Sequence, residues 1–338
     1  MRSLRSGIGQ FFQKYPAQKT AFCAHILKIR QLTYLISAIF YSFFLEFSKK
    51  SLLSPITSQK TSYLLPLTTY LLPLTSHLYK KIMENLTIVK VGGKIVEEEA
   101  SLKQLLADFS SIEGKKLLVH GGGRSATRMA ERLGIATQMV EGRRITDTPM
   151  LEVVTMVYGG LVNKTIVARL QALGINALGM TGADMNIMLS DRRPVKTIDY
   201  GWVGDVRRAD GVALSRLIDS GVVPVIAPLT HDGKGNMLNT NADTMAGETA
   251  KALAKHYRVT LVFCFEKNGV LRDENDDNSV IPSITPEEYA QLRAEGIVQG
   301  GMIPKLDNSF ATLSAGVNEV IITKASNLHN LSLGTHLR

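Results

Sequence analysis

Two lysines beside glycine turns and one aspartate are the residues of this sequence best suited to chemistry. Lys90 lies inside the apolar segment 86–91, just before a pair of glycines, and Lys305 follows a second glycine pair. A lysine inside an apolar strand usually has a partner, although an edge-strand or surface position would leave it in solvent. Asp243, at the end of Asn239-Thr-Asn-Ala-Asp243, could cap a helix or hold lysine ammonium groups. The three residues are therefore candidates for a site that acts on an anion.

A run of three glycines marks a second candidate site. Gly121, Gly122 and Gly123 follow the apolar strand predicted at 116–120 and precede a predicted helix. Glycines let a backbone approach a ligand closely, and the amides at a helix N-terminus attract phosphate or carboxylate. A tight turn with positive φ would need only one glycine. Three in a row favour an anion site.

Two familiar catalytic patterns are missing from the sequence, and a third stays open. The chain contains neither G-x-x-x-x-G-K-[ST] nor G-x-S-x-G. Gly121-x-Gly123-x-x-Ala126, with Glu141 about twenty residues further on, does fit the dinucleotide fingerprint. A dinucleotide-binding oxidoreductase is thus one alternative, but it leaves Lys90 and the other glycine pair unexplained.

Composition and charge exclude several classes of protein. Two cysteines in 338 residues build neither a disulfide-stapled scaffold nor a cysteine metal site. The formal net charge is +9, yet residues 1–82 carry +10 and residues 83–338 carry −1. A nucleic-acid footprint should lie on the folded domain. We therefore expect no nucleic-acid partner.

Residues 1–82 differ from the rest of the chain in composition and pattern. They contain an uncharged, largely apolar run at 31–45, which is short of the ~20 residues that span a bilayer. A direct repeat with proline follows at 62–68 and 69–75, and proline prevents a continuous helix there. We interpret residues 1–82 as an N-terminal extension outside the fold, with the natural start at Met83. The alternatives are a targeting segment or an anchor that makes this a membrane-tethered binding protein.

From residue 83 onward, strand and helix signals alternate, which is typical of an α/β fold around a mainly parallel sheet. We expect one domain of two lobes, because no linker interrupts residues 83–338. The expected strands are 86–91, 116–120, 222–226, 259–265 and 318–323. The expected helices are 97–112, a helix from the glycine run to Gly134, one from an N-cap at Thr148 to about 174, one capped by Asp243 at 244–255, and one opened by a capping box at 285–288.

Six motifs occur in order, and together they resemble the amino acid kinase family, specifically its members that phosphorylate an N-acylglutamate. The motifs are Lys90-Val-Gly-Gly93, His120-Gly-Gly-Gly123, Gly142-Arg-Arg-Ile-Thr146, Val162-Asn-Lys164, Asn239-Thr-Asn-Ala-Asp243 and Gly301-Met-Ile-Pro-Lys305. The combination of Arg144 with Asn239 separates these members from their relatives. The resemblance runs from about residue 86 to residue 323.

The resemblance implies a fold and a role for each matching residue. The fold would be a three-layer α/β/α sandwich around a mainly parallel open sheet, with an acylglutamate lobe at about 83–238 and an ATP lobe at about 239–338. Lys90 and Lys305 would stabilise the transferred phosphoryl group, and Asp243 would organise both lysines. The substrate would be held by Gly122, Gly123, Arg144 and Asn239. ATP would be bound by Gly92, Gly93, Glu266, Lys267, Asn268, Gly269, Val270, Leu271, Ile297, Val298 and Gln299.

The implied reaction is ATP-dependent phosphorylation of the side-chain carboxylate of an N-acyl-L-glutamate, the second step of arginine biosynthesis. The acyl group, acetyl or succinyl, stays open, as does another acceptor such as aspartate, glutamate, carbamate or UMP. The co-substrate would be ATP, with Mg²⁺ held mainly by the nucleotide phosphates and no metal site built by the protein. The resemblance further implies a cytoplasmic homodimer, with no membrane partner expected.

Overall fold

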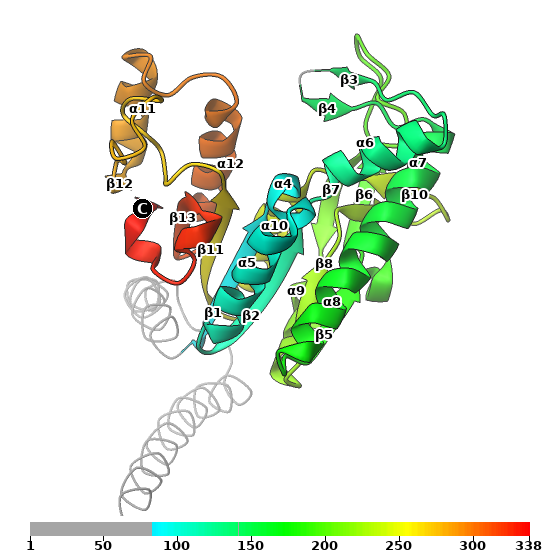
Figure 1. Ribbon diagram of the computed structural model, residues 1–338, viewed down its shortest axis with the longest axis horizontal. Helices are drawn as coiled ribbons and strands as arrows, with labels where there is room; N and C mark the ends of the chain where they lie inside the picture. Colours follow the sequence, from blue (N-terminus) through cyan, green and yellow to red (C-terminus); the bar gives the residue numbers. More distant parts are fainter. Residues whose placement is uncertain (1–82, 141) are drawn as a thin grey trace, which may run out of the picture. The chain divides into compact units, whose positions relative to one another are not determined.

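The structure is a computed structural model that describes residues 83–140 and 142–338 (Figure 1). The expectations for residues 1–82, and the expected role of Glu141, lie outside the described residues. Everything below concerns the unit that contains residues 83–338.

An eight-stranded sheet forms the centre of this unit, in the order β12-β14-β13-β11-β1-β2-β8-β5. All neighbouring pairs are parallel except β13 and β14. The strands are β1 (Asn85–Val91), β2 (Lys115–His120), β5 (Ala177–Met180), β8 (Val223–Ile226), β11 (Arg258–Phe265), β12 (Ser283–Ile284), β13 (Glu319–Lys324) and β14 (Thr335–Leu337). The mainly parallel sheet is therefore confirmed.

Both faces of the sheet are buried, which explains why its strands are apolar without alternation. Along β1, Leu86 and Ile88 belong to one core, whereas Val89 and Val91 belong to the other. Side chains alternate between the faces of a strand. Lys90 must therefore lie on the same face as Leu86 and Ile88.

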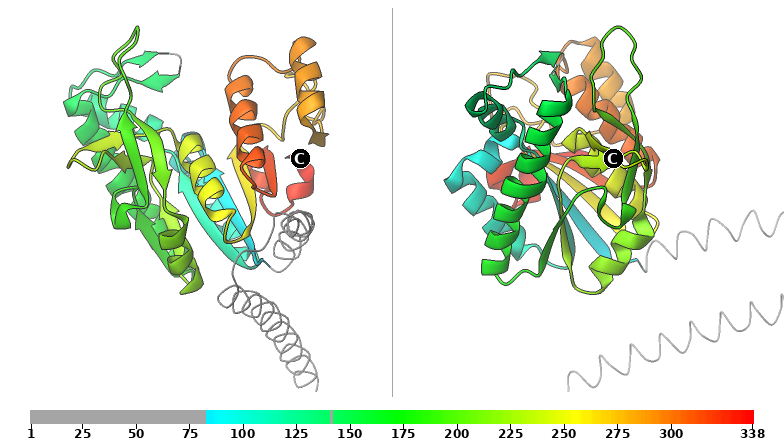
Figure 2. Two further views of the ribbon diagram at one scale, coloured as in Figure 1. Left: turned by 180° about the vertical axis from the view of Figure 1, so that it is seen from behind. Right: turned by 90° about the vertical axis from the view of Figure 1, so that its right-hand side faces the viewer.

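Helices cover each face and complete three layers, as expected (Figure 2). The core that contains Ile88 is covered by α9 (Gly211–Asp219), α10 (Ala242–Leu253), α11 (Pro286–Ala294) and α12 (Met302–Ser314). The core that contains Val89 is covered by α4 (Gly93–Glu97), α5 (Glu99–Ser111), α6 (Gly123–Arg132), α7 (Thr148–Val154), the π-helix η1 (Thr155–Val162) and α8 (Asn163–Ala172).

Two smaller sheets were not predicted from the sequence. One has the order β10-β9-β6-β7 and the other pairs β3 with β4. Their strands are β3 (Met139–Val140), β4 (Arg143–Arg144), β6 (Met188–Arg192), β7 (Gly204–Ala209), β9 (Leu229–His231) and β10 (Met237–Asn239); short 3₁₀ turns lie at η2 (Asp184–Asn186), η3 (Ala325–Asn327) and η4 (Leu331–Leu333). These strands are short and partly exposed, so they lack the long apolar runs that marked the central strands.

Two expected helix caps are wrong by one or two residues. Asp147, not Thr148, caps α7, and its side chain accepts a hydrogen bond from the amide of Met150. Asn241, not Asp243, caps α10 by accepting from the amides of residues 243 and 244. Asp243 instead lies in the first turn of α10, where its carboxylate is available to a lysine. The capping box at Thr285 is confirmed, whereas the expected helix 97–112 is interrupted at Glu98.

The helices α7, η1 and α8 form one continuous helix of 25 residues, Thr148–Ala172. By length and composition alone this helix could cross a membrane. However, Val153, Val157, Ile166 and Leu170 on its inner side are buried in the core of the sandwich. It is therefore a core helix of the folded domain.

Candidate active site

The glycine loops at the ends of β1 and β2 pack directly against each other. Gly121 donates its amide hydrogen to the carbonyl of Val91 at 3.0 Å. A Cβ atom on Gly121 would lie 3.1 Å from the nitrogen of Gly93. On Gly122 a Cβ would lie only 2.8 Å from Cδ1 of Tyr158. None of Gly121, Gly122 and Gly123 has a φ in the left-handed range, and the φ of Gly122 is 170°, so close packing, rather than a left-handed turn, requires these glycines.

The two glycine loops enclose a pair of backbone amides. Within the described part of the chain, the N–H groups of Gly122 and Gly123 have no hydrogen-bond acceptor. A Cβ atom on Gly93 would lie 3.5 Å and 3.4 Å from these nitrogens. Gly93 therefore leaves open the space that an acceptor oxygen would occupy. Because α6 also begins at Gly123, its N-terminal partial charge adds to the attraction for an anion.

Lys90, Asp243 and Lys305 form a charge cluster on the face of the sheet covered by α10 and α12. The Nζ atom of Lys90 lies 2.6 Å from Oδ1 of Asp243. Lys305 lies in the first turns of α12, with its Nζ atom 4.4 Å from the ring centroid of Phe265. Helix α10 packs on both β1 and α12. Three segments that are distant in the sequence thus supply one cluster.

The pKa values of this cluster show that its members interact. Burial alone would raise the pKa of Asp243, but the positive charges of Lys90 and Lys305 outweigh it, so that pKa is lowered. Burial lowers the pKa of Lys305, Asp243 opposes the shift, and Lys90 adds to it. The aspartate is therefore ionised at neutral pH, and both lysines favour its charged form.

A cavity of about 200 Å³ lies beside the glycine loop. Its lining contains Gly122, Gly123, Arg144 and Asn239, the residues predicted to hold the substrate. It also contains Gly142, Arg143, Thr240, Asn241 and Ala242 from two of the motifs, and five residues that the sequence did not single out: Met139, Tyr158, Arg193, Val203 and Pro228. Spacing could not reveal these residues, because they come from separate elements that only the fold brings together.

Arg144 is buried in this cavity without a carboxylate partner in the described residues. Its Nη2 atom donates to the carbonyl of Gly123 and to Oγ1 of Thr127, both at 2.8 Å. The amide nitrogen of Asn239 donates to Oγ1 of Thr146 at 2.9 Å. A buried guanidinium normally pairs with an anion. The cavity is therefore suited to a ligand that carries a carboxylate.

A second cavity, of about 400 Å³, holds most of the residues predicted to bind ATP. It is lined by Lys267, Gly269, Val270, Leu271, Ile297, Val298 and Gln299, together with Phe265, Glu274, Gly300, Gly301 and Met302. In the sequence, Lys305 follows Met302, the last residue that lines this cavity. Asp243 likewise follows Ala242, the last residue that lines the first cavity. Phe265, which lines this second cavity, also lies under the ammonium group of Lys305.

Four residues predicted to bind ATP do not line this second cavity. Gly92 and Gly93 belong to the loop after β1. Glu266 pairs with Lys94 at 3.0 Å, and Asn268 donates to the carbonyl of Asp277 at 2.9 Å. Of these four residues, only Gly93 lies beside the amides of Gly122 and Gly123.

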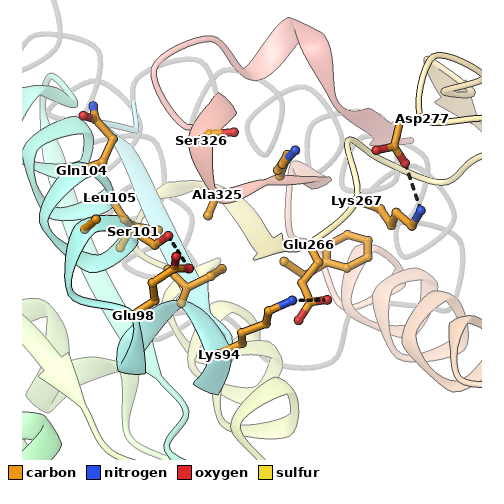
Figure 3. A pocket seen from close by; sticks show the side chains of 14 residues that line it. Lys94, Glu98, Ser101, Gln104, Leu105, Glu266, Lys267, Asp277, Ala325 and Ser326 are labelled. Atoms are coloured by element: carbon orange, nitrogen blue, oxygen red, sulfur yellow. Dashed lines mark hydrogen bonds and ion pairs between the residues drawn. The ribbon is translucent and has the colours of Figure 1, made fainter.

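A third cavity, of about 610 Å³, lies between α4, α5 and the turns after β11 and β13 (Figure 3). The sequence did not predict a separate site here, although Glu266 and Lys267, which were predicted to bind ATP, line this cavity. Its charged side chains largely neutralise one another: Lys94 pairs with Glu266 at 3.0 Å, and Lys267 pairs with Asp277 at 2.9 Å. Its walls thus offer much weaker attraction to an anion than the first cavity does.

The donor set is compatible with Mg²⁺ carried by a nucleotide. No cluster of three or more His, Cys, Asp or Glu side chains that could hold a metal occurs among residues 83–140 and 142–338. Mg²⁺ usually keeps several waters and binds through phosphates with one or two carboxylates. The single carboxylate of Asp243 beside the anion site agrees with that arrangement.

An open, mainly parallel sheet, an amide pair at a helix N-terminus and two lysines that interact with one aspartate are typical of α/β enzymes that act on phosphate groups. Comparison with known proteins agrees with this class. Residues 85–324 match the model of the amino acid kinase family, and the chain belongs to that family.

Named relatives and solved structures lead to the same family. The chain is 71% identical to acetylglutamate kinase of Phocaeicola vulgatus over 72% of its own length and 95% of the relative. It is 69% identical to acetylglutamate kinase of Bacteroides fragilis over 74% and 96%. Carbamate kinase from Giardia lamblia bound to AMP-PNP shares the fold, with a TM-score of 0.56 and 15% identity over 75% and 98%. These findings confirm a kinase and argue against the dinucleotide-binding oxidoreductase.

Proposed function

We propose that this kinase transfers the γ-phosphoryl group of ATP to the side-chain carboxylate of an N-acyl-L-glutamate, the second step of arginine biosynthesis. The named relatives support the reaction. The observation that carries it is Arg144, a buried guanidinium without an acidic partner among the described residues, in a cavity next to the charge cluster. The fork of a guanidinium matches a carboxylate at two points. Arg144 would bind the α-carboxylate, and Asn239 would contact the acylamino group.

The charge cluster supplies what phosphoryl transfer needs. The transition state is loose, so positioning and charge neutralisation matter more than covalent help. Lys90 and Lys305 would hold the transferred group from two sides, and Asp243 would keep both lysines in place. The amides of Gly122 and Gly123 would donate to its oxygens. Since a glutamate carboxyl has a pKa of ~4.3 and is already ionised, no general base is required.

ATP would lie in the second cavity, with its phosphates directed toward Lys305 and Gly93. Mg²⁺, held mainly by the phosphates, would neutralise their charge. We accordingly assign residues 83–238 to binding of the acylglutamate and residues 239–338 to binding of ATP. Two exceptions are the loop at Gly92 and Gly93, which comes early in the chain but adjoins the phosphoryl site, and Asn239, which lies in the second range but lines the substrate cavity.

The homodimer and the cytoplasmic location also belong to this proposal. Support for a homodimer comes from β5, which is an edge strand of the central sheet and exposes Leu178. The adjoining helix exposes Met156 and Leu161. An unpaired edge and exposed apolar side chains are features that a second copy would cover. The cytoplasmic location rests on the biosynthetic role.

The substrate is tested by ADP formation from ATP with a panel of acceptors. We expect turnover with N-acetyl-L-glutamate or N-succinyl-L-glutamate, and background rates with aspartate, glutamate, carbamate and UMP. Lys90→Ala should lower turnover by roughly 10²-fold or more while the fold is retained, because a preorganised charge is lost. A fast reaction with another acceptor on the panel would contradict the proposed substrate.

Arg144→Lys tests the carboxylate contact separately from the chemistry. Lysine keeps the charge but loses the two-point fork, so we expect the KM for the acylglutamate to rise by about tenfold or more while the KM for ATP changes little. Arg128→Lys is the matched control, because Arg128 lies on α6 with a side chain that is 65% exposed. Equal effects of the two changes would show that Arg144 does not bind the substrate.

A further inference from the structure

His120 is a buried residue that the reaction described above does not use. It ends β2 and is completely inaccessible to solvent. Its Nδ1 atom lies 2.8 Å from the carbonyl oxygen of Gly121, and its Nε2 atom lies 3.1 Å from the side-chain nitrogen of Asn163. Asn163 is equally buried and begins α8. Both residues belong to motifs, yet neither lines the two cavities of the reaction.

The hydrogen bonds around Asn163 fix the protonation state of this histidine. The amide nitrogen of Asn163 donates to the carbonyl of Val225 at 2.9 Å, and its oxygen accepts from Lys164 at 3.1 Å. Its nitrogen therefore faces His120 as a donor, and Nε2 must accept. The carbonyl of Gly121 can only accept, so Nδ1 must carry the proton. Both contacts require the neutral ring with hydrogen on Nδ1.

The surroundings of His120 keep the ring neutral. Burial lowers its pKa to about 4, the bond to Gly121 opposes the shift, and the charge of Lys164 on α8 adds to it. The ring is therefore neutral near pH 7, as both of its hydrogen bonds require.

The bond from His120 sets the direction of an amide that faces the phosphoryl site. Gly121 C=O and Gly122 N–H belong to one peptide unit, and cis peptide bonds are absent from the described residues. In a trans peptide the N–H points opposite to the C=O. Holding the carbonyl toward His120 thus turns the Gly122 amide away from it, toward the space beside Gly93.

The continuous helix that carries Asn163 also packs against Gly122, the residue that follows Gly121 in the loop. Tyr158 lies in η1 and leaves no room for a Cβ atom on Gly122. In a π-helix, hydrogen bonds run from residue i to residue i+5, so two residues that are five apart lie on nearly the same side of the helix. In an α-helix the same two residues would be separated by a rotation of about 500° and would point to different sides. The π-helical turn thus lets Tyr158 and Asn163 reach the glycine loop together.

We propose that His120 and Asn163 are positioning residues: Asn163 fixes the Nδ1–H form of His120, and His120 holds the Gly121 carbonyl so that the Gly122 amide points at the transferred phosphoryl group. This inference rests on the proposed phosphoryl transfer, while the hydrogen-bond network it uses can be measured without turnover.

A matched pair of variants at His120 tests the bond. The amide nitrogen of asparagine can take the place of Nδ1, whereas that of glutamine takes the place of Nε2. We expect His120→Asn to keep kcat within about threefold of the wild-type value. His120→Gln should lower kcat by about tenfold to 10²-fold, with the KM for ATP nearly unchanged, because misplacing a catalytic group by ~1 Å can cost 10²-fold. Equal kcat values for two folded variants would overturn the proposal.

Asn163→Asp gives a second test if the His120 variants do not fold. The carboxylate cannot donate to Nε2 and favours a proton there, so the neutral ring would lose its bond to Gly121. Only the doubly protonated ring would satisfy both neighbours. We therefore expect kcat of this variant to be low at pH 8 and to recover as the pH falls, unlike that of the wild type. A pH profile parallel to the wild-type profile would count against the proposal.

Nitrogen NMR of the histidine rings separates this inference from the proposed function. In wild-type protein with ¹⁵N-labelled histidine, His120 should show a protonated Nδ1 and an unprotonated Nε2 from pH 5 to pH 8. His329→Gln, which removes an exposed histidine, is the assignment control. A proton on Nε2 would refute the network even in an active kinase. A correct ring signal without turnover on either acylglutamate would instead refute the proposed substrate.

Discussion

At the scale of single residues, the site depends on cations held close together around one carboxylate. Lys305 is mostly buried and lies beside Lys90, and both effects lower its pKa; Asp243 is the group that opposes the shift. A lysine with a lowered pKa loses its charge at a lower pH than a lysine in water. The alkaline limit of the reaction should therefore lie below the ordinary range of lysine.

Asp243→Asn should move this limit further toward neutral pH. Removing the carboxylate takes away the interaction that raises the pKa of Lys305, so the ammonium group would deprotonate earlier as the pH rises. We expect the falling alkaline limb of kcat to shift to lower pH, with kcat below the wild-type value throughout. The measurement is ADP formation from pH 6 to pH 10, with Asp277→Asn as a control in an ion pair outside the charge cluster.

An unchanged alkaline limb in Asp243→Asn would mean that the charge of Lys305 does not limit the reaction. The same profile in both aspartate variants would point to a general effect of lost negative charge.

The residue types and their spacing predicted much of this cluster. Lys90 inside an apolar strand, Asp243 near a helix start and Lys305 after a glycine pair all stood out in the sequence. Tyr158 and Arg193 did not, because one belongs to an apolar helix and the other lies in a polar segment without a motif. Only tertiary structure brings them to the substrate cavity.

At the scale of elements, the packing of η1 against the loop after β2 explains why the loop is glycine. Gly122→Ala would place a methyl group 2.8 Å from the buried ring of Tyr158. We expect a loss of about 1–3 kcal/mol in the free energy of unfolding, as is typical of overpacking, together with a lower kcat. Thermal and urea unfolding measure the first effect.

Gly160→Ala is the control for this change, because a Cβ atom on Gly160 would meet nothing within 4 Å. It should be neutral or slightly stabilising. Combining Gly122→Ala with Tyr158→Ala should destabilise by less than the sum of the single changes, since the double variant removes the clash. Additive losses would show that Tyr158 is not what excludes a side chain from position 122.

The element boundaries show where sequence reasoning reaches its limit. Strands buried on both faces were found because their apolar runs are continuous, whereas β6 and β7 alternate and are partly exposed. The π-helical turn was missed because its residues are apolar and compatible with an ordinary helix. It packs against the glycine loop, α6 and β9, and no local sequence pattern records these contacts.

At the scale of the whole domain, every strand of the central sheet among the described residues lies after Met83. Its strands run from Asn85 to Leu337, and both of its faces are covered by helices of the same unit. We expect a chain that starts at Met83 to unfold at the same temperature as the full chain, within about 2 °C, and to retain its turnover. Calorimetry and ADP formation on the two chains check this.

A large loss of stability in the chain from Met83 would show that the preceding residues belong to the fold. Loss of turnover alone would instead assign them a role in the reaction.

One further consequence follows from the thiol of Cys264 in β11, next to the phenylalanines beneath Lys305. It is 1% exposed, and burial raises its pKa to about 12. Oxidants and electrophiles act on the thiolate, which at cellular pH is almost unpopulated here. This sulfur therefore offers oxidants and electrophiles almost no reactive form inside the central sheet, even under conditions that consume exposed thiols.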